Sequence, residues 1–473
     1  MALEGVQESV NPMRVNPIRH WKGKPVTVFG LGRSGESAAN LLLAWGAEVT
    51  IVEECVTDEV QQTRDRLLQE GIKVLLGDVA EEGCSRAELV VVSPGVPKEH
   101  RVIRNLQKRG VPVIGEIELA SWFTEVPIIA VTGTNGKSTT VRLIGAILQQ
   151  SGKNVFVGGN LGTPLCEAVP RPEAHSMQPG YEWIVAEVSS FQLETIHHFR
   201  PSIAILLNVT PDHLDRHPNK DDYIAAKQRI FENQTASDMA VINWDDCEVR
   251  SMASKAPSRM YAFSLKGPVE RGLYVDQETI RSRMNGGDVP IMARDQLPLR
   301  GDHNVANAMV AIGVGLLCGC SIPDIVQGLQ RTPTFEHALE PVREWQGIRF
   351  INDSKGTNVD ATLKAIQSFQ EPLILIVGGK DKGGDFSQLA ESIRHGVKHL
   401  VVIGEATPKI QAALGSVKPL TVATTLTEAV AQAVRAAVPG DVVLFSPACA
   451  SFDMFRNYHH RGLEFKRIVG ELP

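Results

Sequence analysis

Short apolar runs that stop at a glycine or a polar turn recur along the chain, and helical patterns separate many of them. The first series, within residues 1–115, comprises PVTVFG, EVTIVEE, IKVLLGD and ELVVVSPG. A second comprises VPIIAVTG, EWIVAEVSS, PSIAILLNVT and DMAVINW, and a third comprises IRFIND, LILIVGG, HLVVIGE and DVVLFSP. Apolar strands that alternate with helices are typical of parallel sheets covered on both faces. The pattern therefore predicts an α/β protein with three tandem domains.

We expect each domain to be built on a mainly parallel sheet. Residues 1–115 form a Rossmann-like domain that begins with a loose arm, residues 1–24. Residues 116–333 form a P-loop ATPase-like domain, in which the alternation weakens between Ser251 and Arg300 and the apolar segment Ala308 to Cys320 is expected to be a buried helix. Residues 334–473 form a second Rossmann-like domain. The length of 473 residues agrees with three domains at ~150 residues each.

Composition and charge narrow the class of protein. Lys and Arg number 48 against 54 Asp and Glu, which gives a net charge of −6 and no global basic field to attract nucleic acid. The longest apolar segment is too short to cross a ~30 Å hydrocarbon layer, and no signal peptide is visible. Seven cysteines without a CxxC pair argue against a disulfide framework or a structural zinc site. We expect a cytoplasmic protein without a membrane span.

A glycine fingerprint, GLGRSG, follows the first strand. Gly30, Gly32 and Gly35 have G-x-G-x-x-G spacing, and Glu53 ends the next strand. Such glycines let a diphosphate approach the backbone at a helix N-terminus, and Glu53 offers an acceptor for ribose hydroxyls. The motif indicates a diphosphate ligand, although a tight turn without a ligand has the same spacing. It does not by itself indicate nicotinamide chemistry.

A phosphate-binding motif follows the first strand of the second series, in AVTGTNGKSTT. Gly133 and Gly136 leave backbone amides accessible to phosphates, Lys137 offers an ammonium group, and Ser138 offers a hydroxyl to Mg²⁺. The standard spacing G-x-x-x-x-G-K-[ST] would require a glycine at Val131, so this loop is a variant. Because a purely structural turn rarely combines a strand, GKS and a helix, we predict a nucleotide site here.

Acidic and imidazole residues follow other strands of the same domain. Glu187 ends EWIVAE, while Asp212 and His213 follow AILLNVT, with Asp215 two residues further on. Magnesium ligands lie at the carboxyl ends of such strands, so Glu187 and His213 are candidate ligands, whereas Asp215 has the pattern of an ordinary solvated residue. Lys227 lies in a helical pattern that by itself predicts a solvated lysine.

Three polar loops in the third series carry lysines, glycines and hydroxyl residues directly after apolar strands. They are INDSKGTN, GGKDKGGDF and SPACASFDMF, and they contain Asp353, Lys355, Lys382 and Ser451. Each loop alone has the pattern of an ordinary turn, but together they would rim one edge of a parallel sheet. We predict that this edge binds a ligand.

The motifs TGTNGKST, EVSSFQLE, LNVTPDHLDRH, GDHNVANA, NDSKGTN and SPACASFDMF resemble, in this order, those of the Mur ligases of peptidoglycan synthesis. The resemblance extends from about Val26 to the C-terminus and is strongest to members that add D-glutamate. It implies that ATP phosphorylates the carboxylate of UDP-N-acetylmuramoyl-L-alanine and that the amine of D-glutamate attacks the acyl phosphate. It also implies a monomer with ATP and two Mg²⁺ ions.

The resemblance also implies roles for individual residues. Catalysis would rest on Lys137, Glu187, His213 and Lys227, and Mg²⁺ binding on Ser138, Glu187, His213 and Lys227 as a carbamate. ATP would contact Gly133, Thr134, Asn135, Gly136, Lys137, Ser138, Thr139, Asn304, Asn307, Asp353 and Lys355. The UDP-sugar would contact Gly32, Arg33, Ser34, Glu53, Ser93, Asn160, Ser189, Gln192 and His213. D-Glutamate would contact Thr357, Lys382, Ser451 and Tyr458.

The sequence departs from the family pattern at one position, and two alternative functions remain open. In FEHALE the family usually has His-Arg, whereas here His337 is followed by Ala338, so a cation expected near the nucleotide is missing. The first alternative is a Mur-type ligase that adds a different amino acid. The second is a P-loop ATPase that acts as a switch, and nicotinamide binding at GLGRSG becomes the least favoured interpretation.

Overall fold

The computed structural model describes residues 21–160, 162–171, 180–212, 216–217, 219–284, 286–333 and 335–473. The first domain holds a parallel sheet of five strands in the order β3-β2-β1-β4-β5. Its strands are β1 (Pro25–Phe29), β2 (Glu48–Glu53), β3 (Lys73–Leu76), β4 (Leu89–Val92) and β5 (Val113–Gly115). Its helices are α2 (Arg33–Ala44), α3 (Asp58–Gln69), α4 (Ala80–Gly83) and α5 (Arg101–Lys108), and α6 (Glu116–Trp122) leads onward.

The second domain holds a nine-stranded sheet in the order β14-β13-β12-β11-β10-β9-β6-β8-β7. Its strands are β6 (Ile128–Thr132), β7 (Val155–Gly159), β8 (Trp183–Glu187), β9 (Ile203–Leu206), β10 (Met239–Asn243), β11 (Arg259–Ser264), β12 (Gly272–Asp276), β13 (Thr279–Ser282) and β14 (Val289–Ala293). The last two strands pair antiparallel. They occupy the region where the sequence pattern loses its alternation.

Helices cover both faces of this second sheet. They are α7 (Lys137–Gln150), α8 (Ser190–Leu193), α9 (Lys220–Gln228), α10 (Cys247–Ala253), α11 (Asp302–Leu317) and α12 (Ile322–Arg331), with short 3-10 turns at Leu165–Ala168, Arg229–Phe231 and Arg294–Gln296. The apolar segment predicted as a buried helix lies mostly in α11, where residues 307–315 are all buried. This prediction is confirmed.

The third domain holds six strands in the order β15-β16-β20-β17-β18-β19, parallel except at β15. They are β15 (Glu340–Trp345), β16 (Ile348–Asn352), β17 (Leu373–Gly378), β18 (Val397–Ile403), β19 (Leu420–Ala423) and β20 (Val442–Phe445). Its helices are α13 (Val359–Gln367), α14 (Ala390–Gly396), α15 (Thr407–Leu414), α16 (Leu426–Ala436) and α17 (Tyr458–Gly470), with a 3-10 turn at Phe386–Leu389. The prediction of three α/β domains with mainly parallel sheets is confirmed.

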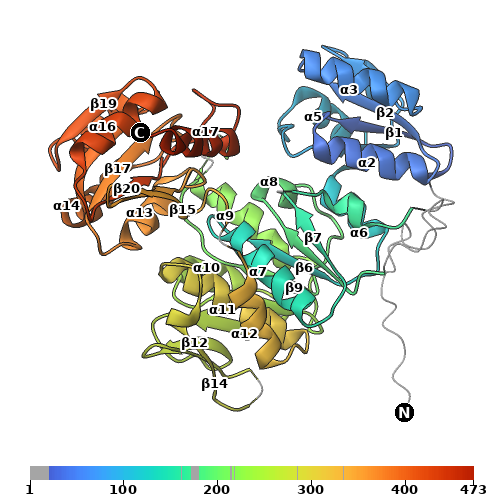
Figure 1. The fold of residues 1–473 in the computed structure, drawn as a ribbon. Coiled ribbons are helices and arrows are strands. Elements are labelled where there is room, and N and C mark those ends of the chain that lie inside the picture. Colours follow the sequence, from blue (N-terminus) through green and yellow to red (C-terminus); the bar gives the residue numbers. More distant parts are fainter. Residues whose placement is uncertain are drawn as a thin grey trace.

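The arrangement of the domains brings the functional loops toward one another. Figure 1 shows the first domain in blue and the third in orange and red as two separate lobes, with the second domain joining them below. Apolar residues of the first sheet, such as Val28 and Leu89, belong to one continuous buried cluster with Ala130 and Phe156 of the second domain. The first two domains therefore share a core. No helix in the described ranges is long and apolar enough to cross a membrane.

Candidate functional site

The phosphate loop connects β6 to α7, as the sequence predicts. Gly136, the residue before α7, has φ +87°, and a Cβ there would lie 2.4 Å from Oδ1 of Asn307. Any other residue at position 136 would therefore be strained and would collide with α11. The Asn307 Oδ1 also accepts a hydrogen bond from Thr140 Oγ1 at 3.2 Å. The loop and the start of α11, two regions predicted to meet ATP, are thus in direct contact.

Lys137 lies folded back over its own loop. Its Nζ donates to the carbonyl oxygens of Gly133 at 2.9 Å and Thr134 at 2.7 Å. Burial lowers the pKa of Lys137, while Glu187 and Asp212 act in the opposite direction. The amine is therefore held where a phosphate chain wrapped by the loop would meet it.

Lys227, on α9, is 1% exposed, so its helical pattern alone would have misplaced it in solvent. Its Nζ donates to Gly133 O at 2.8 Å and lies 4.6 Å from the centre of the Tyr223 ring. Burial, and then the charge of Lys137, hold the pKa of Lys227 well below its ordinary value. Both effects shift the equilibrium of Lys227 toward the neutral amine.

Oxygen ligands suited to magnesium converge at the end of β8. The Glu187 carboxylate, 3% exposed, accepts hydrogen bonds from Ser138 Oγ at 2.6 Å and Asn160 Nδ2 at 3.0 Å. Carboxylate, hydroxyl and amide oxygens are hard ligands that fit Mg²⁺. His213, the other strand-end candidate, lies outside the described residues. Ser189 and Gln192 form a capping box at the start of α8.

Two ionisable residues from the third domain, the buried Asp353 and the half-buried Lys355, line the cleft opposite the phosphate loop. Burial raises the pKa of Asp353 to about 7, although its carboxylate accepts from Ser446 Oγ at 2.6 Å and Leu339 N at 3.2 Å. Burial also lowers the pKa of Lys355 to about 8. Thr357 follows in the same loop, and its backbone N donates to Lys355 O at 2.9 Å.

Polar contacts bridge the second and third domains. Asn135 of the phosphate loop donates to Asp360 Oδ2 at 2.6 Å, and Asn358 donates to Asp212 Oδ2 at 3.1 Å. The other Asp212 oxygen lies 3.6 Å from Nζ of Lys382. Sequence reasoning did not single out Asn358 and Asp360 as site residues, although Asn358 lies within the NDSKGTN motif.

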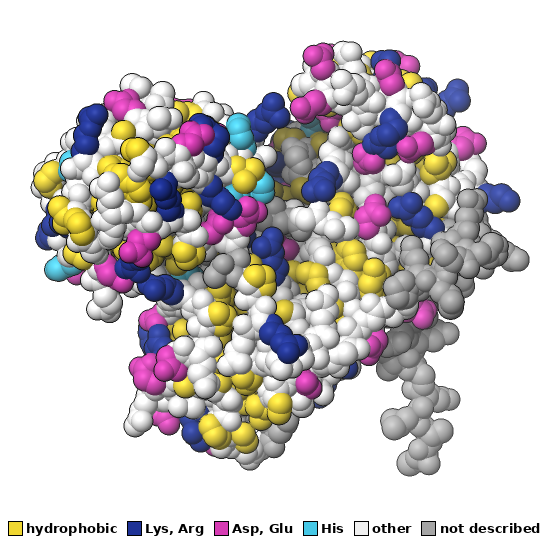
Figure 2. All heavy atoms as spheres, viewed as in Figure 1, with side chains coloured by type: hydrophobic (Ala, Val, Ile, Leu, Met, Phe, Trp, Pro, Cys, Tyr) yellow, Lys and Arg dark blue, Asp and Glu magenta, His cyan; other side chains and the backbone are white. Residues whose placement is uncertain are grey.

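These walls enclose a cleft of about 750 Å³. Its lining residues come from the second and third domains. Above it, Figure 2 shows a further hollow between the lobes of the first and third domains, with Lys and Arg side chains along it. Ser451 is buried at 2% exposure in the loop after β20 and does not line the cleft. The candidate residues that do line it are Thr134, Asn135, Gly136, Lys137, Ser138, Thr139, Asn160, Glu187, Asn304, Asn307, Asp353, Lys355, Thr357, Lys382 and Tyr458.

The glycine fingerprint of the first domain forms the turn between β1 and α2. A Cβ at Gly35 would lie 2.0 Å from Gly30 O, so this glycine is required by the backbone, whereas Gly32 has open space around it. Glu53 accepts from the backbone N of Leu31 at 2.7 Å, and Ser93 Oγ donates to Gly30 O at 2.9 Å. Both side chains thus shape the turn that carries Gly32, Arg33 and Ser34.

A smaller cavity of about 120 Å³ lies between the first and second domains, and Ser93 and Gln192 both line it. Arg216 also lines it and donates to the carbonyl oxygens of Gly95 at 3.1 Å and Val96 at 2.9 Å. The fingerprint region is thereby fastened to the second domain. Sequence reasoning missed Arg216, although the motif LNVTPDHLDRH contains it.

Three models of Mur ligase domains match successive parts of the chain. The "MurD-like, N-terminal domain" matches residues 24–115, the "Mur ligase middle domain" residues 131–315, and the "Mur ligase, glutamate ligase domain" residues 339–449. The chain belongs to the Mur ligase family.

Individual relatives narrow the comparison. The UDP-N-acetylmuramoylalanine--D-glutamate ligases of Koribacter versatilis (strain Ellin345) and Pelotomaculum thermopropionicum (strain DSM 13744 / JCM 10971 / SI) are 43% and 42% identical to this chain. The alignments cover 95% and 96% of this chain and 98% of each relative. Among solved structures, a pseudomurein peptide ligase type C from Methanothermus fervidus shares the fold at a TM-score of 0.60 and 16% identity, over 95% of this chain and 100% of that chain.

Proposed function

We propose that this chain is an ATP-dependent amide ligase that joins D-glutamate to UDP-N-acetylmuramoyl-L-alanine, releasing ADP and phosphate, in peptidoglycan precursor synthesis. The observation that carries the proposal is the near full-length identity of 43% to a ligase of that name, together with a phosphate loop that opens into a cleft between the second and third domains. We also propose that it acts as a cytoplasmic monomer with domain limits at residues 1–115, 116–333 and 334–473.

In the proposed first step, the substrate carboxylate attacks the γ-phosphate of ATP, forming an acyl phosphate and ADP. Two anions must approach each other, so cations are needed between them. Lys137 is within reach of the phosphates because it already lies over the loop. Lys355 adds a second amine on the opposite wall, and Asn304, Asn307 and Asp353 are proposed to hold the nucleoside. The amine of D-glutamate then displaces phosphate from the acyl group.

We propose two Mg²⁺ ions, held by Ser138, Glu187, His213 and a carbamate on Lys227. Mg²⁺, when bound, neutralises charge on the phosphate oxygens. The carbamate forms when a neutral amine captures CO₂ and loses a proton, and the depressed pKa of Lys227 supports this because it favours the neutral amine. A carbamylated lysine keeps one N–H, so the hydrogen bond to Gly133 O can persist.

The incoming amino acid is proposed to bind at Thr357, Lys382, Ser451 and Tyr458. Thr357, Lys382 and Tyr458 line the cleft, and Lys382 offers an ammonium to a carboxylate of the amino acid. The UDP-sugar is proposed to bind at Gly32, Arg33, Ser34, Glu53 and Ser93 of the first domain and to reach Asn160, Ser189, Gln192 and His213 of the second. A diphosphate at the α2 N-terminus would meet bare backbone amides there.

Phosphate release tests this function. We expect release only when ATP, Mg²⁺, UDP-N-acetylmuramoyl-L-alanine and an amino acid are all present, and faster with D-glutamate than with L-glutamate, D-aspartate or diaminopimelate. Faster release with another amino acid would favour a different Mur-type ligase. Release that needs neither the UDP-sugar nor an amino acid would favour a P-loop ATPase switch.

A further inference from the structure

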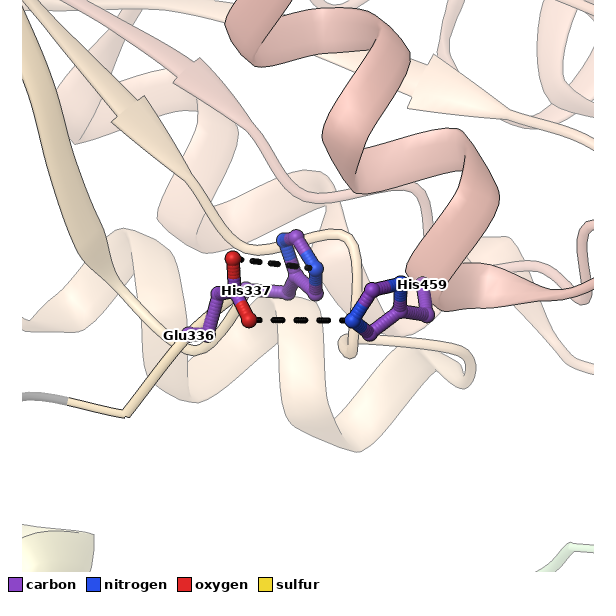
Figure 3. Close-up of side chains that lie close together, drawn as sticks. All are labelled: Glu336, His337 and His459. Atoms are coloured by element: carbon purple, nitrogen blue, oxygen red, sulfur yellow. Dashed lines mark ion pairs between the residues drawn. The ribbon is translucent and has the colours of Figure 1, made fainter.

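Two histidines and a glutamate meet in the third domain, between the segment before β15 and the start of α17. Glu336 and His337 precede β15, and His459 lies in the first turn of α17. Figure 3 shows the three side chains turned toward one another, and their potential ligand atoms all lie within 4.8 Å of one another. The Glu336 Oε2 is 3.6 Å from His459 Nε2, and its Oε1 is 4.0 Å from His337 Nε2.

His337 is the fixed member of this cluster. Its ring is 1% exposed, and Nε2 is buried without a hydrogen-bond partner among the described residues. The backbone holds φ at +64°, a rare conformation for a non-glycine residue, and a Cβ at Gly462 would lie 2.3 Å from the ring. The surrounding structure therefore holds a buried imidazole whose Nε2 faces a carboxylate but makes no hydrogen bond, which is rare for a buried polar atom.

We propose that Glu336, His337 and His459 form a binding site for a divalent transition metal of the Zn²⁺ class. In tetrahedral zinc sites the ligand atoms are about 3.4 Å apart, so these atoms, now 3.6 to 4.8 Å apart, need to approach by at most about 1.4 Å. Glu336 and His459 can make this adjustment because they are 47% and 53% exposed. Two imidazoles favour zinc over magnesium, unlike the oxygen ligands around Glu187. The fourth position is left to water.

Charged neighbours of the cluster affect how tightly it can bind a metal. The Lys466 ammonium lies 3.0 Å from Glu336 Oε1 and 2.6 Å from Glu340 Oε1, so it competes with the metal for Glu336 but leaves Oε2 accessible. Metal binding at His337 Nε2 requires the ring proton at Nδ1. That atom lies 3.6 Å from Glu340 Oε2, which can accept the proton's hydrogen bond. The Asn352 amide now donates to Nδ1 at 2.9 Å, so metal binding also requires this amide to turn away from the protonated Nδ1; it keeps Gly462 O as an acceptor at 3.2 Å.

The site lies directly behind the cleft. His337 O accepts from Lys355 N at 2.9 Å, and Tyr458, which lines the cleft, is adjacent to His459. A metal at this place would tie the segment before β15 to α17 and thereby couple two walls of the cleft. This metal site is separate from the proposed magnesium centre, and its occupancy can be measured whether or not the proposed ligase activity is correct.

Calorimetric titration of the metal-free full-length protein with Zn²⁺, in excess Mg²⁺ and without nucleotide, tests the proposal. We expect one site whose affinity falls at least tenfold in His459→Ala and in Glu336→Gln. Lys466→Ala should bind more tightly because it frees the Glu336 carboxylate. His460→Ala is the matched control, since it removes the adjacent exposed histidine of the same helix, and its affinity should equal that of the unmodified protein.

Co²⁺ gives a second, spectroscopic measurement. We expect the visible absorption of a four-coordinate Co²⁺ site in the unmodified protein and in His460→Ala, and its loss in His459→Ala. The unfolding temperature should rise with Zn²⁺ by a few degrees more in the unmodified protein than in His459→Ala. Equal Zn²⁺ affinity in His459→Ala and the unmodified protein, or no Zn²⁺ binding to either, would overturn the assignment.

Discussion

Lys137 and Lys227 donate hydrogen bonds to the same acceptor, the carbonyl oxygen of Gly133, at 2.9 and 2.8 Å. One amine comes from the phosphate loop and the other from α9, so two like charges would meet in a buried place. This repulsion adds to burial in depressing the pKa of Lys227. The loop thus holds one lysine suited to phosphates and a second whose equilibrium is shifted toward the neutral amine.

Replacing Lys137 should remove the cation that faces the phosphates. We expect Lys137→Ala to lose ~10²-fold or more in kcat, because an electrostatic contact in a dry site is deleted. The measurement is phosphate release at saturating substrates. Lys255→Ala, a change of an exposed lysine, serves as the control and should stay within a few-fold. Comparable activity of Lys137→Ala and Lys255→Ala would indicate that ATP does not bind at this loop.

Lys227 can be tested by chemical rescue. We expect Lys227→Ala to lose most activity and to regain part of it when acetate supplies the missing oxygens. Lys227→Arg should not recover, since a guanidinium stays cationic and cannot carry the carbamate. A carbon NMR signal from labelled CO₂, present in the unmodified protein and lost in Lys227→Ala, would identify the carbamate directly. Full activity of Lys227→Ala would remove this lysine from the mechanism.

A substitution at Gly32 can distinguish the proposed UDP-sugar site from the proposed ATP site. Because nothing lies within 4 Å of a Cβ built there, Gly32→Val should leave the unfolding temperature nearly unchanged. It should weaken UDP-sugar binding at least tenfold, since a side chain would occupy the approach to the turn, while ATP affinity stays the same. Calorimetric titration with each ligand measures both. Binding of NAD in place of the UDP-sugar would reverse the assignment of this domain.

Asp353 should make stability depend on pH. Its pKa is about 7 in the folded protein and near its ordinary value of 3.8 in the unfolded chain, so between these values the folded state binds more protons. Stability from this group is therefore complete below pH ~4 and falls as pH rises through ~7. Between pH 5 and pH 8, the unfolding temperature of the unmodified protein should fall relative to that of Asp353→Asn. A constant difference between the two proteins would contradict the buried, protonated carboxyl.

Much of the architecture could be predicted because it depends on local patterns. The apolar runs that became β1, β6 and β17 lie before glycine turns, and GKS stands at the start of α7. The strand ends placed Glu187 at the edge of the second sheet and Asp353 at the edge of the third, since parallel strands of one sheet present their carboxyl ends at one edge. That these two edges face the same cleft depends on how the domains pack, which the patterns do not give.

Contacts between distant residues could not be predicted in this way. The pattern around Lys227 gives no sign that α9 turns this lysine toward Gly133, 94 positions earlier. Glu336 and His459 likewise meet only because α17 packs beside the segment before β15. The cysteine pattern argued against a structural zinc site but had no bearing on one built from histidines and a glutamate.

Tyr458 stands at the start of the last helix, α17, yet it lines the same cleft as the phosphate loop. Arg461 of this helix is 2% exposed and donates to Ser354 O at 2.8 Å and Cys449 O at 3.1 Å, which secures the helix to the loops after β16 and β20. During ribosomal synthesis the first two domains can fold before this helix emerges. The cleft is therefore completed only after α17 has been translated, and a chain that stops before α17 would display the phosphate loop without Tyr458 opposite it.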